Sequence, residues 1–264
     1  MIDIKLIARD DLDYYSALLP VATLLPVAYR DGLRLRKSIP SLPNASNPYG
    51  TTGAGSEKIK ILGLGESSIS GVGVETHDQG LTGRVAAHLA NQLGVQIDWE
   101  VVAEKGYTAR MVNDLLLPTL PQVEQDIFFV GLGGNDSFQM TKPTVWRLEM
   151  TRLLDQLVVH SPSAKIVCVN MPGVHDFPAF TPALKKVMNV QVDILRDHLA
   201  DVAADRDEVL FLHDKIYLEA WSERHALTHP LEDYYSDGVH PSAVTYNYWG
   251  KDVAHQVASW YSKD

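Results

Sequence analysis

The chain has 264 residues, of which 45% are hydrophobic and 21% are charged, the composition of an ordinary globular protein. Asp and Glu outnumber Lys and Arg by 33 to 23, so the formal net charge is −10. Such a charge repels polyanions, and we expect no nucleic acid as a partner. The single cysteine, Cys168, excludes a disulfide framework and a thiolate metal cluster. It lies in an apolar run, so we expect a buried core thiol.

Near its N-terminus the chain carries an apolar stretch, residues 16–29, that two prolines interrupt. The stretch is shorter than the ~20 residues of a membrane-spanning helix. Acidic residues precede it, where a secretory signal carries basic ones. We therefore expect a cytoplasmic protein without a signal peptide or transmembrane helix. Because Pro20 and Pro26 limit helix length, the stretch is predicted to form only short turns. Four of its leucines are expected to be buried against another surface, either protein or lipid: Leu18, Leu19, Leu24 and Leu25.

Four basic residues between positions 30 and 37 leave a second interpretation open, namely a segment that lies on a membrane surface. We favour packing against protein, because the net charge and the acidic residues upstream disfavour an anionic bilayer. Residues 38–57 are rich in Pro, Gly, Ser and Asn, which is typical of a linker or an extended strap. The chain is thus predicted to comprise an N-terminal arm and strap, 1–57, and a main domain, 58–264.

Within the main domain, short apolar runs alternate with longer amphipathic stretches. Most of the runs lack polar alternation, which is the pattern of strands buried on both faces. The predicted strands are residues 59–64, 97–102, 127–132, 166–169 and 209–212. The predicted helical segments are residues 80–93, 109–117, 144–160, 182–204 and 242–261.

Strands that alternate with helices pair in parallel through right-handed crossovers. We therefore predict an α/β protein, a three-layer α/β/α sandwich of the flavodoxin-like type with about five parallel strands and an N-terminal extension. In such folds ligands bind beyond the carboxyl ends of the strands. Reactive residues are accordingly expected just after each apolar run.

The first predicted strand is followed by the turn Gly65-Glu66-Ser67-Ser68. A serine that follows a strand and opens a helix exposes its hydroxyl and its own N–H at the sheet edge. This arrangement suits a nucleophile whose product is an oxyanion, although a simple turn or a phosphate cradle has the same pattern. No P-loop motif occurs in the sequence.

The next two predicted strands are followed by glycine-bearing turns. Gly106 allows the backbone to approach a ligand closely and present an N–H, although a glycine needed only for the turn is an equal alternative. After the third strand, the turn Gly133-Gly134-Asn135-Asp136 carries an amide that can donate and accept hydrogen bonds. An Asn-Asp pair is also ordinary turn chemistry.

Near the C-terminus, Asp237 and His240 are three residues apart on the loop that precedes the last predicted helix. The carboxylate can accept the Nδ1 proton and leave Nε2 as a base, which is the arrangement that a catalytic triad needs. His225 and His229 are four residues apart, but no H-E-x-x-H motif accompanies them. We therefore expect no metal.

Together the four blocks resemble the SGNH hydrolases, also called the GDSL esterase/lipase family, which is named after Ser, Gly, Asn and His in this order. The matching positions are Ser67, Gly106, Asn135 and His240. The G-x-N-D and D-x-x-H blocks of the family are both present. The first block departs from the family, because Glu66 stands where Asp is usual. The resemblance spans about residues 58–264.

This resemblance implies a serine hydrolase that needs no metal or other cofactor and acts on a small-molecule carboxylic ester. Ser67 would be the nucleophile, His240 the base and Asp237 the residue that orients the base. The oxyanion would be held by the N–H groups of Ser67 and Gly106 and by the Asn135 amide.

The family hydrolyses lipid esters, thioesters and acetylated sugars on one scaffold, so the resemblance does not select a substrate. The loop 171–180 is expected to wall the site, and its Phe177 and Phe180 favour an apolar acyl or aryl group if they are not plain core residues. We favour esters of small or medium acyl chains. The alternatives are a membrane-associated lipase or thioesterase, a carbohydrate acetylesterase, and a non-catalytic, flavodoxin-like anion-binding module.

Overall fold

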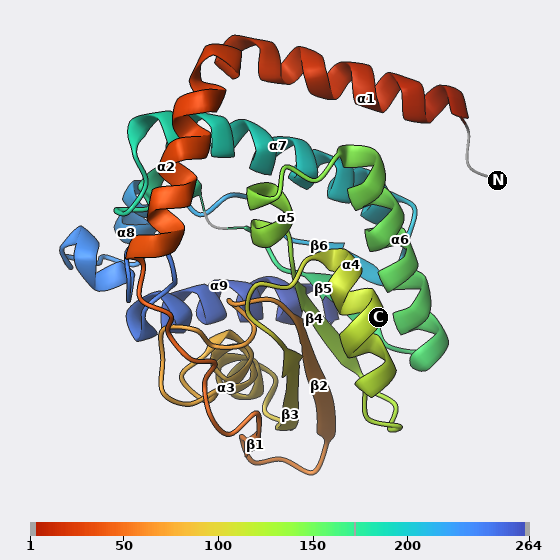
Figure 1. The fold of residues 1–264 in the computed structure, drawn as a ribbon. Coiled ribbons are helices and arrows are strands. Elements are labelled where there is room, and N and C mark those ends of the chain that lie inside the picture. Colours follow the sequence, from red (N-terminus) through yellow and green to blue (C-terminus); the bar gives the residue numbers. More distant parts are fainter. Residues whose placement is uncertain (1–3, 172, 262–264) are drawn as a thin grey trace.

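The computed structural model describes residues 4–171 and 173–261 (Figure 1). Residues 1–3 of the predicted arm, Pro172 of the predicted wall loop and residues 262–264 of the predicted main domain lie outside the described residues. Six strands form one sheet in the order β1-β3-β2-β4-β5-β6. The strands are β1 (Tyr49–Thr52), β2 (Lys58–Gly65), β3 (Gln96–Ala103), β4 (Ile127–Gly131), β5 (Lys165–Cys168) and β6 (Val209–Phe211).

Strands β2 to β6 are parallel, which confirms the predicted α/β sandwich and its five parallel strands. The sixth strand is a correction, since β1 comes from the predicted strap and pairs antiparallel with β3. Without it, β3 would present a row of unpaired backbone groups at the sheet edge. The Thr51 hydroxyl donates to Asp98 on β3 over 2.7 Å and ties the added strand in place.

Helices cover both faces of the sheet (Figure 1). On one face α3 (Leu81–Leu93) packs against α9 (Ala243–Tyr261), and on the other α6 (Pro143–His160) packs against α7 (Pro182–Ala204). The shorter helical segments are α4 (Ala109–Met111), the π-helical η2 (Val112–Leu116), η3 (Leu117–Thr119), α5 (Gly134–Phe138), η4 (Val174–Asp176), α8 (Leu218–Arg224) and η5 (Leu231–Tyr234).

The predicted helical segment 109–117 is divided into α4, η2 and η3 rather than forming one helix. Pro118 lies at the start of η3. A proline has no N–H to donate to the preceding turn, so a regular α-helix cannot continue through it.

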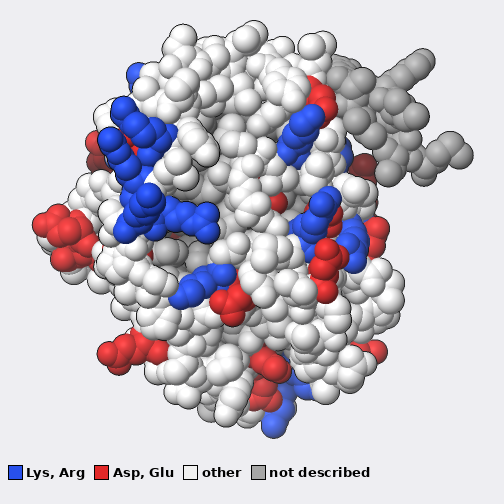
Figure 2. All heavy atoms as spheres, viewed as in Figure 1, with Lys and Arg blue, Asp and Glu red and all other residues white. Residues whose placement is uncertain are grey.

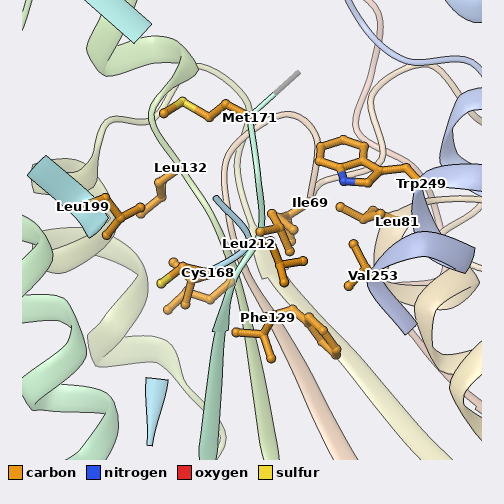
Figure 3. Close-up of a cluster of buried hydrophobic side chains, with 14 of the residues drawn as sticks. Ile69, Leu81, Phe129, Leu132, Cys168, Met171, Leu199, Leu212, Trp249 and Val253 are labelled. Carbon is orange, nitrogen blue, oxygen red and sulfur yellow. The ribbon is translucent and has the colours of Figure 1, made fainter. Parts of the chain in front are cut away.

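The hydrophobic core lies on both sides of the sheet. Figure 3 shows Leu199 of α7 on one side of the strands, with Trp249 and Val253 of α9 on the other. Cys168 is 1% exposed, and burial raises the pKa of its thiol to about 12. It is therefore a protonated core residue, as predicted.

The N-terminal arm is helical, so the prediction of short turns is wrong. Helices α1 (Ile4–Leu18) and α2 (Leu25–Ser38) are joined by the 3₁₀ turn η1 (Leu19–Leu24). Pro20 and Pro26 each lie in the first turn of a helical segment. An N–H in the first turn has no intrahelical partner, so a proline there removes no helical hydrogen bond. The two prolines thus begin helical segments instead of ending them.

The arm packs across α6 and α7 (Figure 1). Of its four leucines, Leu18 is buried, Leu24 and Leu25 are half-buried, and Leu19 is 70% exposed. None of the helices in the described part of the chain is long and apolar enough to be a membrane span.

Two aspartates fix the arm to the helices beneath it. Asp11 accepts hydrogen bonds from Lys142 at 3.2 Å and Thr144 at 3.3 Å, at the start of α6. Asp31 on α2 is buried and accepts a hydrogen bond of 2.8 Å from Thr181, the residue that caps α7. The Thr181 hydrogen bond lowers the pKa of Asp31, so this carboxylate remains ionised. Helix α2 is thereby held beside the start of α7.

Candidate active site

The turns after β2, β3 and β4 and the loop before α9 come together at the carboxyl edge of the sheet. Residues from all four segments line one cavity of about 950 Å³. Those predicted from the sequence are Ser67, Gly106, Asn135 and His240. Parallel strands end at the same sheet edge, and this explains why residues 29 or more positions apart in the chain meet here.

Close contact between β2 and β4 shapes the turn that carries Ser67. Glu66 donates its N–H to the Gly131 carbonyl over 3.0 Å. A β-carbon on Gly65 would lie 2.1 Å from the same oxygen, so only glycine fits at this position. The chain then leaves the strand sharply, and Ser67 is half-buried in the wall of the cavity.

Asp237 and His240 form a hydrogen-bonded pair. The Asp237 Oδ2 atom lies 2.7 Å from His240 Nδ1, and Oδ1 accepts the backbone N–H groups of Val239 and His240 at 3.0 and 2.8 Å. The Asp237 side chain is 1% exposed, whereas that of His240 is 25% exposed. An ionised carboxylate can only accept, so Nδ1 carries the proton and Nε2 is the free acceptor of the ring.

Opposing effects set the pKa of Asp237. Burial alone would raise it, but the hydrogen bonds from the ring and backbone of His240 and from Val239 hold the pKa below its usual value. The carboxylate therefore stays ionised at neutral pH. It can stabilise a protonated imidazole beside it, which is the electrostatic role of a triad carboxylate.

Glu66, the departure from the family pattern, holds the Asn135 turn. Its carboxylate accepts the backbone N–H groups of Gly134 at 2.7 Å and Asn135 at 2.9 Å, and it also accepts from Asn135 Nδ2. The same Nδ2 donates to the Tyr107 carbonyl at 3.1 Å. Both N–H groups of this amide are thus engaged within the protein.

Asp136 joins the Asn135 turn to the segment that follows Gly106. Its buried carboxylate accepts the backbone N–H of Ala109 at 2.9 Å and the hydroxyl of Thr141 at 3.2 Å. Burial raises the pKa of Asp136 to about 6. Gly106 itself has φ +82°, and a β-carbon there would meet no atom within 4 Å. Its positive φ, rather than lack of space, therefore favours glycine.

Burial raises the pKa of Glu66 from 4.5 to about 7, against the N–H groups that favour its ionised form. A raised pKa means that the folded protein favours the protonated carboxyl. The resulting stability is present below pH 4.5 and is lost as the pH rises through 7. We expect the wild type to lose about 3 kcal/mol of unfolding free energy over this range relative to Glu66→Gln, which cannot ionise there. Urea denaturation at several pH values measures this difference, and a constant difference would contradict the assignment.

Of the remaining residues considered in the sequence, Phe177, Phe180, His225 and His229, only Phe177 lines the cavity. Phe177 is 6% exposed and lines the cavity, whereas Phe180 packs behind it with ring centroids 5.0 Å apart. His225 pairs with Asp252, and His229 with Asp233. Within residues 4–171 and 173–261, no group of three or more His, Cys, Asp or Glu side chains is arranged to hold a metal ion.

One wall of the cavity was not predicted from the sequence. Helix α2 contributes residues from Leu25 to Arg36, and Ile39 follows directly after it. The spacing of Leu25, Ala28, Gly32 and Leu35 is that of one helix face, and it could have indicated this wall. The two prolines obscure this signal in the sequence, because a proline within a helix ends it whereas a proline in the first turn does not.

Positive charge gathers on the outside of α2, in a protein whose formal net charge is −10. Figure 2 shows a group of blue side chains over this helix. The exposed basic residues of α2 are Arg30, Arg34, Arg36 and Lys37. Arg36 also lines the cavity, so a cation lies at its opening.

A serine on a sharp turn and a histidine that is hydrogen bonded to an aspartate, both at one cavity, are features of serine hydrolases. The sequence matches the GDSL-like Lipase/Acylhydrolase family over residues 64–248, which is more than half of the chain. The chain therefore belongs to this family, and it is an enzyme that acts on carboxylic esters. The N-terminal arm and β1 lie outside the matched residues.

Solved structures with the same fold are distant in sequence. "TesA" is 17% identical, with a TM-score of 0.56 over 76% of this chain and 99% of that one. The lipase Lip_vut3 from a goat rumen metagenome is 15% identical, with a TM-score of 0.56 over 76% and 98%. A family 2 carbohydrate esterase from Corynascus thermopiles (Myceliophthora fergusii), solved with its carbohydrate-binding domain, is 17% identical, with a TM-score of 0.55 over 79% and 68%. No curated protein sequence matches the chain.

Proposed function

We propose that the enzyme cleaves carboxylic esters through an acyl-serine intermediate on Ser67. The observation that carries this proposal is the shared cavity. Ser67, Gly106, Asn135 and His240 line it together, and Asp237 is hydrogen bonded to His240 from behind. Family membership favours this catalytic role over that of an anion-binding module.

In the first half of the reaction, Ser67 Oγ attacks the ester carbonyl while His240 Nε2 takes the hydroxyl proton. Asp237 stabilises the imidazolium that results. Negative charge develops on the carbonyl oxygen, and we assign its binding to the N–H groups of Ser67 and Gly106 and to the Asn135 amide. The Asn135 amide must then exchange its hydrogen bond to Glu66 or to the Tyr107 carbonyl for one to the oxyanion. The intermediate collapses, and the departing alcohol takes the proton from His240.

In the second half, water attacks the acyl-serine. His240 now takes a proton from the water and returns it to Ser67 Oγ as the carboxylic acid leaves. Each proton that His240 accepts is thus returned within the same half-reaction.

The lining of the cavity favours an acyl group over a sugar. Side chains from α7, such as Val187 and Met188, and Phe177 from the wall loop make its surface mostly apolar. A carbohydrate would leave its hydroxyl groups without partners against such a wall. We therefore favour esters of aliphatic or aryl acids as substrates over acetylated sugars.

A fluorophosphonate probe tests the proposed nucleophile, because it phosphonylates only a serine that a neighbouring base activates. We expect one covalent adduct per chain in the wild type, located on Ser67 by peptide mass spectrometry. The neighbouring Ser68 also lines the cavity and provides the control. Labelling should persist in Ser68→Ala and disappear in Ser67→Ala. An adduct on Ser68 would show that the wrong serine has been assigned.

A further inference from the structure

Helix α2 presents two different faces. Its exposed face carries the basic residues, whereas Leu25, Ala28, Gly32 and Leu35 point to the cavity that contains Ser67. These four residues follow a spacing of three or four, so they form one stripe along the helix. The stripe is apolar, and two of its members, Ala28 and Gly32, have the smallest side chains.

The opposite wall of the same cavity is also apolar. It consists of α7, α5 and the residues after α5, and its lining residues include Phe138, Met140, Leu184 and Val192. The total volume of about 950 Å³ is near the upper end of the range for small-molecule sites, which is about 300–1,000 Å³. An acetyl group on Ser67 would leave most of this space empty.

The α2 wall is a fixed part of the folded enzyme. The hydrogen bond from Thr181 to the buried Asp31 joins α2 to the start of α7, so the two sides of the chamber are attached to each other. Ala28 is 3% exposed, and the stripe is therefore covered rather than open to solvent at this point.

We infer that α2 and α7 enclose a chamber for the acyl chain of the substrate, and that the enzyme acts on esters of medium to long aliphatic acids. The inference rests on the proposed function, because the chain must be joined to the carbonyl that Ser67 attacks. An acyl chain fits this chamber, because the apolar space is continuous with Ser67, which attacks the carbonyl of the ester.

Gly32 is the position at which this inference can be tested. Glycine is unfavourable within a helix, yet it stands here on the cavity side of α2. A β-carbon at Gly32 would meet no atom within 4 Å. The first carbon of a larger side chain therefore has room on the cavity side of α2, and the substitution also removes the helix penalty of glycine.

The experiment measures kcat/KM for p-nitrophenyl acetate, butyrate, octanoate and laurate. For the wild type we expect kcat/KM to rise with chain length, by up to about fourfold per buried methylene. Gly32→Leu adds four carbon atoms to the chamber, so we expect it to lower kcat/KM for laurate by about 10²-fold. Acetate hydrolysis should stay within about twofold, because the acetyl group does not reach α2.

Two variants serve as controls. Val27→Leu enlarges a residue on the exposed side of α2 and should reproduce the wild-type chain-length profile. Gly32→Ala adds a single methyl group and should show a smaller loss with laurate. The loss should be mainly in KM, since an acyl chain binds equally in the ground state and the transition state.

A flat wild-type profile, or an unchanged laurate-to-acetate ratio in Gly32→Leu, would overturn the acyl chamber. Neither result would affect the proposed esterase function, which depends on whether acetate hydrolysis requires Ser67. Conversely, acetate hydrolysis that survives in Ser67→Ala would overturn the proposed function whatever the chain-length profile.

Discussion

Replacement of Ser67 by alanine is expected to lower kcat for p-nitrophenyl butyrate by about 10⁴–10⁶-fold, the range seen when a serine hydrolase loses its nucleophile. The loss follows because the Ser67 hydroxyl supplies the oxygen that attacks the ester. Gly65 fixes the turn that carries Ser67 against Gly131. Among the described residues, the Ser67 hydroxyl neither donates nor accepts a hydrogen bond, whereas its backbone carbonyl accepts from Ser70 and Val72. Removal of the hydroxyl should therefore leave the melting temperature within about 1–2 °C of the wild type, because it breaks no hydrogen bond and leaves no large cavity in the core.

Ser68→Ala is the matched control for this prediction. Ser68 is the next residue on the same turn and lines the same cavity, so its loss changes the local packing to a similar extent. We expect this variant to retain most of its activity. If Ser68→Ala were the inactive variant and Ser67→Ala the active one, Ser68 would be the nucleophile.

Replacement of His240 by alanine is expected to have a comparably large effect, about 10⁴–10⁶-fold on kcat. Without the imidazole, Ser67 has no group to take its proton, and Asp237 is left buried without its hydrogen-bond partner. Initial rates of p-nitrophenyl butyrate hydrolysis by the wild type and the variant at the same pH would measure this difference.

His229→Ala is the matched control for the base. His229 also pairs with an aspartate, Asp233, four residues away, but it is 44% exposed and does not line the cavity. Its removal should leave kcat unchanged. EDTA should likewise have no effect, and a loss of activity that a divalent ion restores would contradict the mechanism based on His240 as the general base.

The class of fold and the positions of the reactive residues follow from local sequence features. Apolar runs without polar alternation identify buried parallel strands, and such strands end at one sheet edge. Residues placed directly after them, such as Ser67 and Asn135, must therefore gather at that edge. Asp237 and His240 are only three residues apart, so a single tight loop suffices to pair them. These features depend on short stretches of chain, and a sequence displays them directly.

The tertiary structure alone decided what surrounds these residues. Pro20 and Pro26 are compatible with helix breaks and with first turns, and the packing of the arm on α6 and α7 selected first turns. That choice brought α2 to the cavity, more than 25 residues before Ser67 in the chain. Similarly, the carboxylate of Glu66 reaches Gly134 and Asn135 only because β2 and β4 are neighbours in the sheet. Such contacts join distant segments, and their free energy depends on how the whole chain packs rather than on any local pattern.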